Sequence, residues 1–152
     1  MQVESKAFFL SCIDRMRSMD EDQRPIWGSM SPQHMVEHIV GSWRISNGRA
    51  RVELLIKGEE LTKRRDFLFS DDPYERNIPN PTFSKGVPPL RKASLASAID
   101  QLEDEMITFF AHHEAHPDAI EMHPVFGELD YQGWLIFQGK HMKHHMMQFG
   151  LL

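Results

Sequence analysis

A proline-rich stretch in the middle of the chain constrains its fold more than any other feature. Residues 70–90 contain five prolines and little hydrophobic periodicity, so neither a long helix nor a regular strand is expected there. The parts of the chain on either side are too small to form separate cores, and we therefore expect residues 1–152 to form one domain. The stretch is then an ordered crossover inside that domain rather than a linker.

Four segments show the three-to-four-residue spacing of apolar side chains that is typical of amphipathic helices. They cover residues 3–19, 32–48, 91–115 and 131–148. A weaker helical signal lies in residues 52–68, and strand-like alternation is absent. We therefore predict an all-α protein, a four-helix bundle in which the long crossover lets the second and third helices run parallel.

Several of the predicted helix ends carry signals of their own. Ser31 followed by Pro32 is a typical helix start, with serine as the N-cap and proline at the first helical position. Pro117 ends the third helix, Asp130 is a suitable N-cap for the fourth, and Gly150 is a natural stop after it. These signals place the second and fourth helices most firmly.

The charge of the chain argues against nucleic acid as a partner. The net charge is −5 with neutral histidines, and the densest basic cluster, residues 63–65, is followed at once by Asp66. No apolar run approaches the about 20 residues of a membrane-spanning helix. We expect a protein that acts on a small molecule, with neither nucleic acid nor a membrane as its partner.

Cys12 is the only cysteine, which excludes an internal disulfide and a cysteine metal cluster and fits a reducing cytoplasm. Residues 7–12 resemble a lipoprotein signal faintly. Their apolar run is only about four residues long, however, and Glu4 stands where a basic residue would be needed. We therefore expect a cytoplasmic protein without such a signal.

The fourth predicted helix holds a pair of histidines at metal-ligand spacing. His141 and His145 are four residues apart, so they lie one turn apart on the same helix face. Lys140 and Lys143 mark the solvent side of this helix, and the pair points to the opposite side, beside the apolar stripe. His144 falls nearer the edge of that face.

A third ligand is expected from the second helix. His38 lies on its inward half, while His34 lies closer to the boundary of that face. Three imidazoles bind Zn²⁺, Ni²⁺ or Fe²⁺ and leave at least one position of the ion open. The spacing alone does not separate such a site from ordinary core histidines, and it is not the zinc-protease motif HExxH.

The other histidines are weaker candidates. His112, His113 and His116 lie at the end of the third helix, where positive charge complements the helix dipole. His123 precedes a proline in a loop, where it either lines the mouth of a pocket or stabilises the turn. We interpret Cys12 and the ten methionines as core residues rather than as nucleophile and ligands.

Two motifs resemble the DinB-like superfamily of metal-dependent enzymes. The run from Ser31 to His38, SPQHMVEH, is similar to the second helix of that family. The run from His141 to Gln148, HMKHHMMQ, is similar to its last-helix signature, a histidine pair followed by a glutamine. The segment HPVFG at 123–127 and the ending QFG resemble one branch of the superfamily.

The resemblance implies a four-helix bundle with a three-histidine metal site, often in a homodimer. The metal ligands of the family correspond to His38, His141 and His145, and the metal is nickel, zinc or iron. Relatives include thiol-dependent transferases and isomerases as well as amide and ester hydrolases. The chain departs from the common pattern at Met146, where many relatives carry a polar residue, and at the additional His34.

Our first functional hypothesis is a metal-dependent hydrolase whose three-histidine site activates water. His34 or His123 would carry the proton, because histidine titrates near physiological pH. No carboxylate is a convincing base, since Glu37 is expected to face outward and Glu128 lies in a loop.

Two alternatives remain open from the sequence. The metal could bind a low-molecular-weight thiol and direct transfer or isomerisation, with Arg44, Arg49 or Arg51 holding the carboxylates of the thiol. Otherwise the bundle binds a metal or a small molecule without turnover, and the metal only stabilises the fold.

Overall fold

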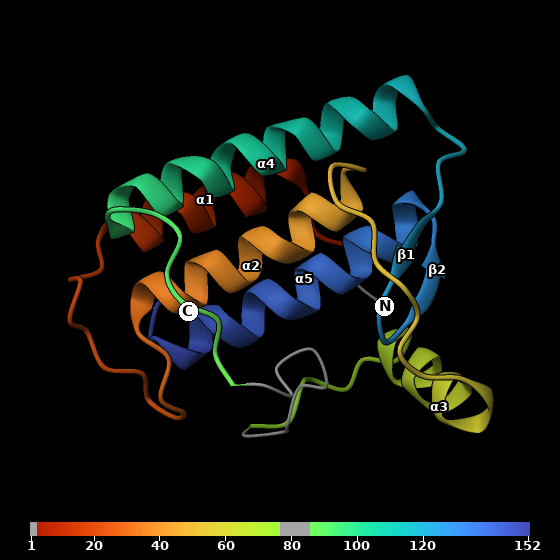
Figure 1. Ribbon diagram of the computed structural model, residues 1–152, viewed down its shortest axis with the longest axis horizontal. Coiled ribbons are helices and arrows are strands. Elements are labelled where there is room, and N and C mark those ends of the chain that lie inside the picture. Colours follow the sequence, from red (N-terminus) through yellow and green to blue (C-terminus); the bar gives the residue numbers. More distant parts are fainter. Residues whose placement is uncertain (1–2, 77–85) are drawn as a thin grey trace.

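The computed structural model describes residues 3–76 and 86–152, and it is mainly helical (Figure 1). Four long helices form the bundle that the sequence predicts, and a shorter helix lies outside it. The helices are α1 (Lys6–Arg17), α2 (Pro32–Ser46), α3 (Gly58–Leu68), α4 (Leu95–Ala115) and α5 (Tyr131–Gln148). Figure 1 shows that α2 and α4, the second and third of the four predicted helices, run parallel, while α1 and α5 run the other way.

The expected caps position α2 and α5. Ser31 Oγ accepts a hydrogen bond from the backbone N–H of His34, and Asp130 does the same for Gly133. The third predicted helix begins later than expected, at Leu95, because Ser94 and Ser97 form a reciprocal capping box. In the weak segment 52–68 only the part from Gly58 is helical.

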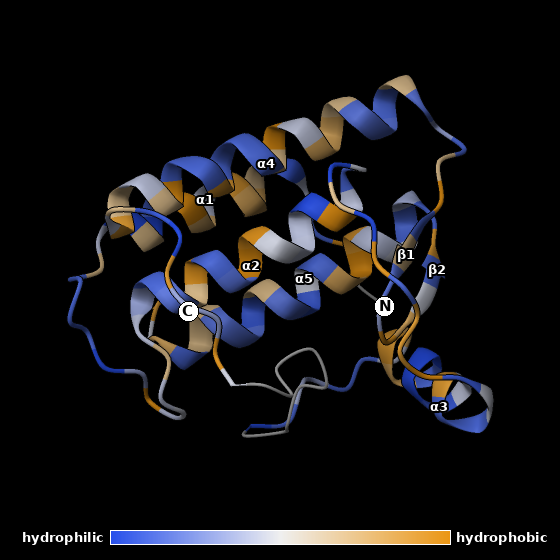
Figure 2. Cartoon of the chain, in the orientation of Figure 1, coloured by the Kyte–Doolittle hydropathy of each residue, from blue (hydrophilic) through white to orange (hydrophobic). Residues whose placement is uncertain are grey.

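The core lies between the four long helices, where α4 contacts α1 and α2, and α5 contacts the same two helices. Trp43 is its centre, fully buried with Phe9 and Phe109 at ring distances of 5.0 and 5.1 Å. Cys12 is also fully buried, and burial raises the pKa of its thiol to about 11, as expected for a core residue. Figure 2 shows the contrast with α3, which is mostly hydrophilic and buries only Leu68.

A short hairpin adds two strands to the all-α fold that the sequence predicts. Strand β1 (Glu121–His123) pairs antiparallel with β2 (Gly127–Leu129), and His123 lies opposite Gly127. Strands of three residues are too short to show alternation in a sequence. The hairpin connects α4 to α5 and contacts α2, so it closes one end of the bundle.

The crossover is attached to the bundle near its start and near its end, on either side of residues 77–85. Near its start, the ammonium group of Lys140 on α5 donates to the backbone carbonyls of Phe67, Ser70 and Asp72. Lys140 is half-buried because the start of the crossover packs against it, whereas Lys143, the other residue expected to mark the solvent side of α5, has a side chain that is 39% exposed. Residues 77–85, in the middle of the predicted crossover, lie outside the described residues.

At the other end, Glu37 on α2 accepts hydrogen bonds from the backbone N–H of Arg91 at 2.7 Å and from its guanidinium at 3.3 Å. Glu37 is only 7% exposed, which corrects the expectation that it faces outward. Burial alone would raise the pKa of Glu37, but the hydrogen bonds from Arg91, Gln33 and Lys92 outweigh it and lower the pKa.

Among the described residues, no helix combines the length and the apolar character needed to span a membrane.

Candidate metal centre

Helix α5 carries the centre of the candidate site and is buried on most of its surface. Gly133 and Gly139 allow close packing, since an added Cβ would lie 3.1 Å from Leu129 and from Glu4 respectively. With the bundle on one side and the crossover on the other, both His141 and His145 are nearly inaccessible, at 7% and 5% exposure. The predicted inward direction of the pair is what the structure shows.

His38 reaches the same point from α2. Its Nε2 lies 2.9 Å from Nε2 of His141, and Nε2 of His145 lies 3.1 Å from the same atom. Among the described residues, these three form the one group of at least three candidate ligands whose donor atoms all lie within 4.8 Å of each other. Ligands about 2.0–2.1 Å from a tetrahedral ion are about 3.3 Å apart, so the spacing is close to that of a metal site.

Gln148 orients the ring of His145. Its Oε1 accepts a hydrogen bond from His145 Nδ1 at 2.7 Å, and its Nε2 donates to the carbonyl of Trp27 at 3.1 Å. The neutral ring therefore carries its proton on Nδ1, and the lone pair on Nε2 points to the other histidines. Gly28 makes room for this contact, because a Cβ there would lie 3.0 Å from Gln148 Nε2. Such a partner on the outer nitrogen is typical of metal-binding histidines.

Burial lowers the pKa of all three imidazoles, so they are neutral at neutral pH. The pKa of His38 falls to about 4, first through burial and then through the neighbouring His144. The pKa values of His141 and His145 lie well below 6.5, again through burial and then through the charges of neighbouring imidazoles. Neutral imidazole is the form that binds a metal ion.

Hydrogen bonds among the three rings cannot give every ring nitrogen of His141 a partner. Its Nε2 lies near two other Nε2 atoms, and one proton serves only one of these contacts. Its Nδ1 is buried and has no hydrogen-bond partner among the described residues. A cation between the rings would satisfy all three inward lone pairs at once, so the residues present fit a divalent transition-metal ion.

Tyr74, Trp27, Arg76 and His144 form a cluster beside the three histidines. Tyr74 of the crossover lies 5.5 Å from the ring of His144 and 6.3 Å from that of His141. Trp27 lies 5.4 Å from His144 on another side, and the Arg76 guanidinium stacks on the Trp27 ring at 3.9 Å. Burial and then the charge of Arg76 lower the pKa of His144, which flanks the site.

Sequence reasoning missed Tyr74 and Arg76, because they lie in a stretch without periodicity. The one signal was local: Tyr74 is the single aromatic side chain among residues 70–76. Burial raises the pKa of Tyr74, so its phenol stays protonated.

The two histidines predicted to carry protons lie in different surroundings. His34 is one turn before His38 on α2, and its Nδ1 lies 2.7 Å from Ser31 Oγ. His123 is 7% exposed, and its Nδ1 accepts hydrogen bonds from the backbone N–H groups of Val125 and Phe126. Burial lowers the pKa of His123 to about 3, and its ring is neutral with the proton on Nε2.

Two of the three arginines considered for holding a thiol's carboxylates, Arg44 and Arg49, have their ion pairs on α4 instead. Arg49 pairs with Asp104 at 3.0 Å and with Glu105 at 2.6 Å, both on α4, and Arg44 lies 3.9 Å from Glu105. Arg51 is exposed. The basic group beside the flanking His144 is Arg76 instead. Glu128, the loop carboxylate considered as a base, is exposed on β2.

Comparison with known proteins identifies the family. The model of the DinB superfamily matches residues 12–149, which is most of the chain, so the protein belongs to this superfamily. No curated protein and no solved structure matches the chain.

Proposed function

We propose that this member of the DinB superfamily is a metal-dependent hydrolase that cleaves an ester or amide bond of a small molecule. The observation that supports it is the meeting of three neutral imidazole nitrogens, from His38, His141 and His145. Three protein ligands leave a position of the ion open for chemistry, whereas a structural zinc site uses four.

A nickel, zinc or iron ion held there would supply Lewis-acid chemistry and make water nucleophilic near neutral pH. The chain's own residues keep the ligands in place and exclude bulk water. Gln148 keeps Nε2 of His145 turned inward, and Phe137 stacks on the ring of His141 at 5.0 Å. Tyr74 covers the three histidines on the side where the crossover lies. In such a dry site, electrostatic interactions with a substrate are stronger than in water.

For the proton transfer we assign different parts to the two candidate histidines. His123 is neutral, holds its proton on Nε2 and uses Nδ1 for two backbone hydrogen bonds, so it suits a fixed hydrogen-bond donor rather than a proton carrier. His34 uses Nδ1 with Ser31, and its Nε2 has no partner among the described residues. His34 is therefore our choice for proton uptake.

A second function is supported by Arg76. This exposed cation lies on Trp27, beside His144, and forms no ion pair with a described residue. It is placed to bind a carboxylate of a low-molecular-weight thiol whose sulfur occupies the open position. The reaction would then be transfer or isomerisation rather than hydrolysis.

Metal content and turnover test the proposal together. We expect protein purified without an affinity tag to hold about one tightly bound metal ion per chain. The His141→Ala/His145→Ala variant should lose it, while His144→Ala, which removes a flanking imidazole from the same helix, should keep it. Retention of the ion by the double variant would show that these histidines are not its ligands.

The reaction class follows from a substrate panel with the metal-loaded protein. Hydrolysis of esters or amides that disappears in the double variant supports the hydrolase. Turnover that requires an added thiol and falls in Arg76→Gln supports the transferase. If the metal raises the unfolding temperature but no substrate is turned over, the protein only binds the metal, and both enzymatic proposals are contradicted.

A further inference from the structure

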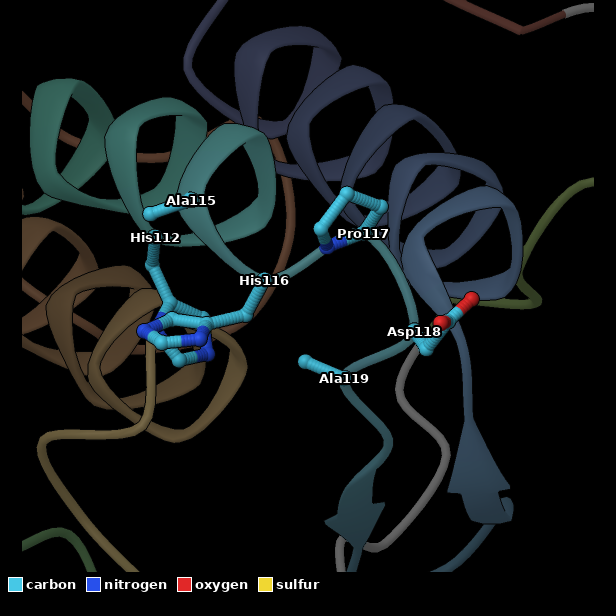
Figure 3. A pocket seen from close by; sticks show the side chains of 6 residues that line it. All are labelled: His112, Ala115, His116, Pro117, Asp118 and Ala119. Atoms are coloured by element: carbon cyan, nitrogen blue, oxygen red, sulfur yellow. The ribbon is translucent and has the colours of Figure 1, made fainter.

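A second group of metal-ligating side chains lies at the C-terminal end of α4, away from the three-histidine site. His112 and His116 are one helical turn apart, and the centroids of their rings are 5.3 Å apart. Nε2 of His112 lies 3.2 Å from a carboxylate oxygen of Glu121 on β1. Figure 3 shows the two rings side by side at the edge of a surface pocket.

The pocket is open to solvent and has a volume of about 550 Å³. Residues 115–119 form the rest of its wall, and Figure 3 shows the carboxylate of Asp118 pointing away from the rings. Gly48, which has a φ of +81°, packs against His112 and Glu121. A Cβ at Gly48 would lie 3.2 Å from the ring of His112 and 3.4 Å from Glu121. His112 and Glu121 are thus held in place.

The electrostatics of this end of α4 favour a cation. The last carbonyls of a helix carry a partial negative charge, and Glu121 adds a full one. Imidazole and carboxylate together are a donor set that Zn²⁺ accepts. The neighbouring His113 does not belong to the set, because it is buried and its Nε2 lies 2.9 Å from the carbonyl oxygen of Ser46.

We propose that His112, His116 and Glu121 form a second, exposed binding site for Zn²⁺ or a similar divalent transition-metal ion. The three side chains are not gathered into a ready-made ligand group as His38, His141 and His145 are. His116 is exposed at the end of the helix, so its ring is free to rotate toward the His112–Glu121 pair. The bound ion would join α4 to β1.

The two sites differ in accessibility, and this separates them experimentally. Zn²⁺ at the α4 site exchanges readily with solution, whereas the three-histidine site is buried. We would titrate metal-free protein with Zn²⁺ by isothermal calorimetry, using wild type and the His112→Gln/His116→Gln variant. The variant should bind one equivalent fewer than wild type, whether or not the three-histidine site takes up the ion.

Single substitutions identify the ligands. His116→Gln should weaken binding at this site by at least about tenfold, since even the loss of an outer-sphere partner costs about 10–100-fold. Glu114→Gln, on the same turn of α4 but lining a different pocket, is the matched control and should bind as wild type does. Equal stoichiometry in wild type and the double variant would overturn the proposal. So would an equal loss of affinity in Glu114→Gln.

Discussion

Replacing Gln148 with leucine should weaken metal binding without touching a proposed ligand. The substitution keeps a side chain of similar size on α5 but removes both hydrogen bonds of the amide, to His145 Nδ1 and to the Trp27 carbonyl. The His145 ring then has no partner that holds its proton on Nδ1, and it is free to turn or to change tautomer. Either change moves the Nε2 lone pair away from the other two rings.

The size of the effect follows from these contacts. Loss of such a partner typically lowers metal affinity about 10–100-fold, which corresponds to about 1.4–2.7 kcal/mol. The metal-free protein is destabilised as well, because each buried group left without a partner costs about 1–3 kcal/mol. Water at the Trp27 carbonyl would reduce the second cost, so we expect a loss of about 1–4 kcal/mol in unfolding free energy.

Two measurements separate positioning from folding. A chelating indicator that competes for Zn²⁺ reports the tighter site of the chain, and urea unfolding of the metal-free protein reports stability. Gln148→Glu is the control, because its carboxylate still accepts from His145 Nδ1 but cannot donate to Trp27. It should keep Zn²⁺ affinity better than Gln148→Leu. Unchanged affinity in Gln148→Leu, with stability alone reduced, would refute the positioning role.

Three other substitutions test the attachments of the fold. Glu37→Gln should lower the urea midpoint at neutral pH by the equivalent of about 1–3 kcal/mol. Because the folded pKa of Glu37 is lowered, its stabilising effect is full above the unfolded value of 4.5 and is lost as the pH falls through the folded pKa. The difference from wild type should therefore shrink in acid, and a constant difference would argue against a charge effect. Gly48→Ala should lower stability by about 1–2 kcal/mol in thermal unfolding, since φ is +81° there and the new Cβ meets His112, and an unchanged melting temperature would contradict this. Lys140→Met removes the donor to the Phe67, Ser70 and Asp72 carbonyls, and amide exchange in residues 67–72 should accelerate while that of α4 stays the same. Equal exchange in both proteins would mean that Lys140 does not hold the crossover.

The parts of the site that lie on single helices were predictable from the sequence. The direction of His141 and His145 follows from the 3.6-residue period, and the same period turns His38 toward them once α2 and α5 pack together. The bundle and the parallel course of α2 and α4 followed from four amphipathic segments and one long connection. All of these depend on local periodicity.

The wrong expectation for Glu37 and the unexpected half-burial of Lys140 arose where the chain folds back over a helix. Glu37 and Lys140 both lie away from the apolar stripe, and periodicity therefore predicts solvent at both positions. The crossover covers them, and a helical projection carries no information on where a distant, aperiodic segment will lie. Tyr74 and Arg76 were missed for the same reason. The roles of His34 and His123, a homodimer and a cytoplasmic location stay predictions.

The two attachment points of the crossover have a consequence for protein engineering. Lys140 directly precedes His141, and Glu37 directly precedes His38, so the crossover is tied to the same helical turns that carry the candidate ligands. We therefore expect that exchanging the chain between Asp72 and Arg91 leaves both anchors, and with them the positions of the candidate ligands, in place. Grafted segments of other length or charge would replace Tyr74 and Arg76 beside the candidate site and so offer a route to altered substrate preference with the same three histidines.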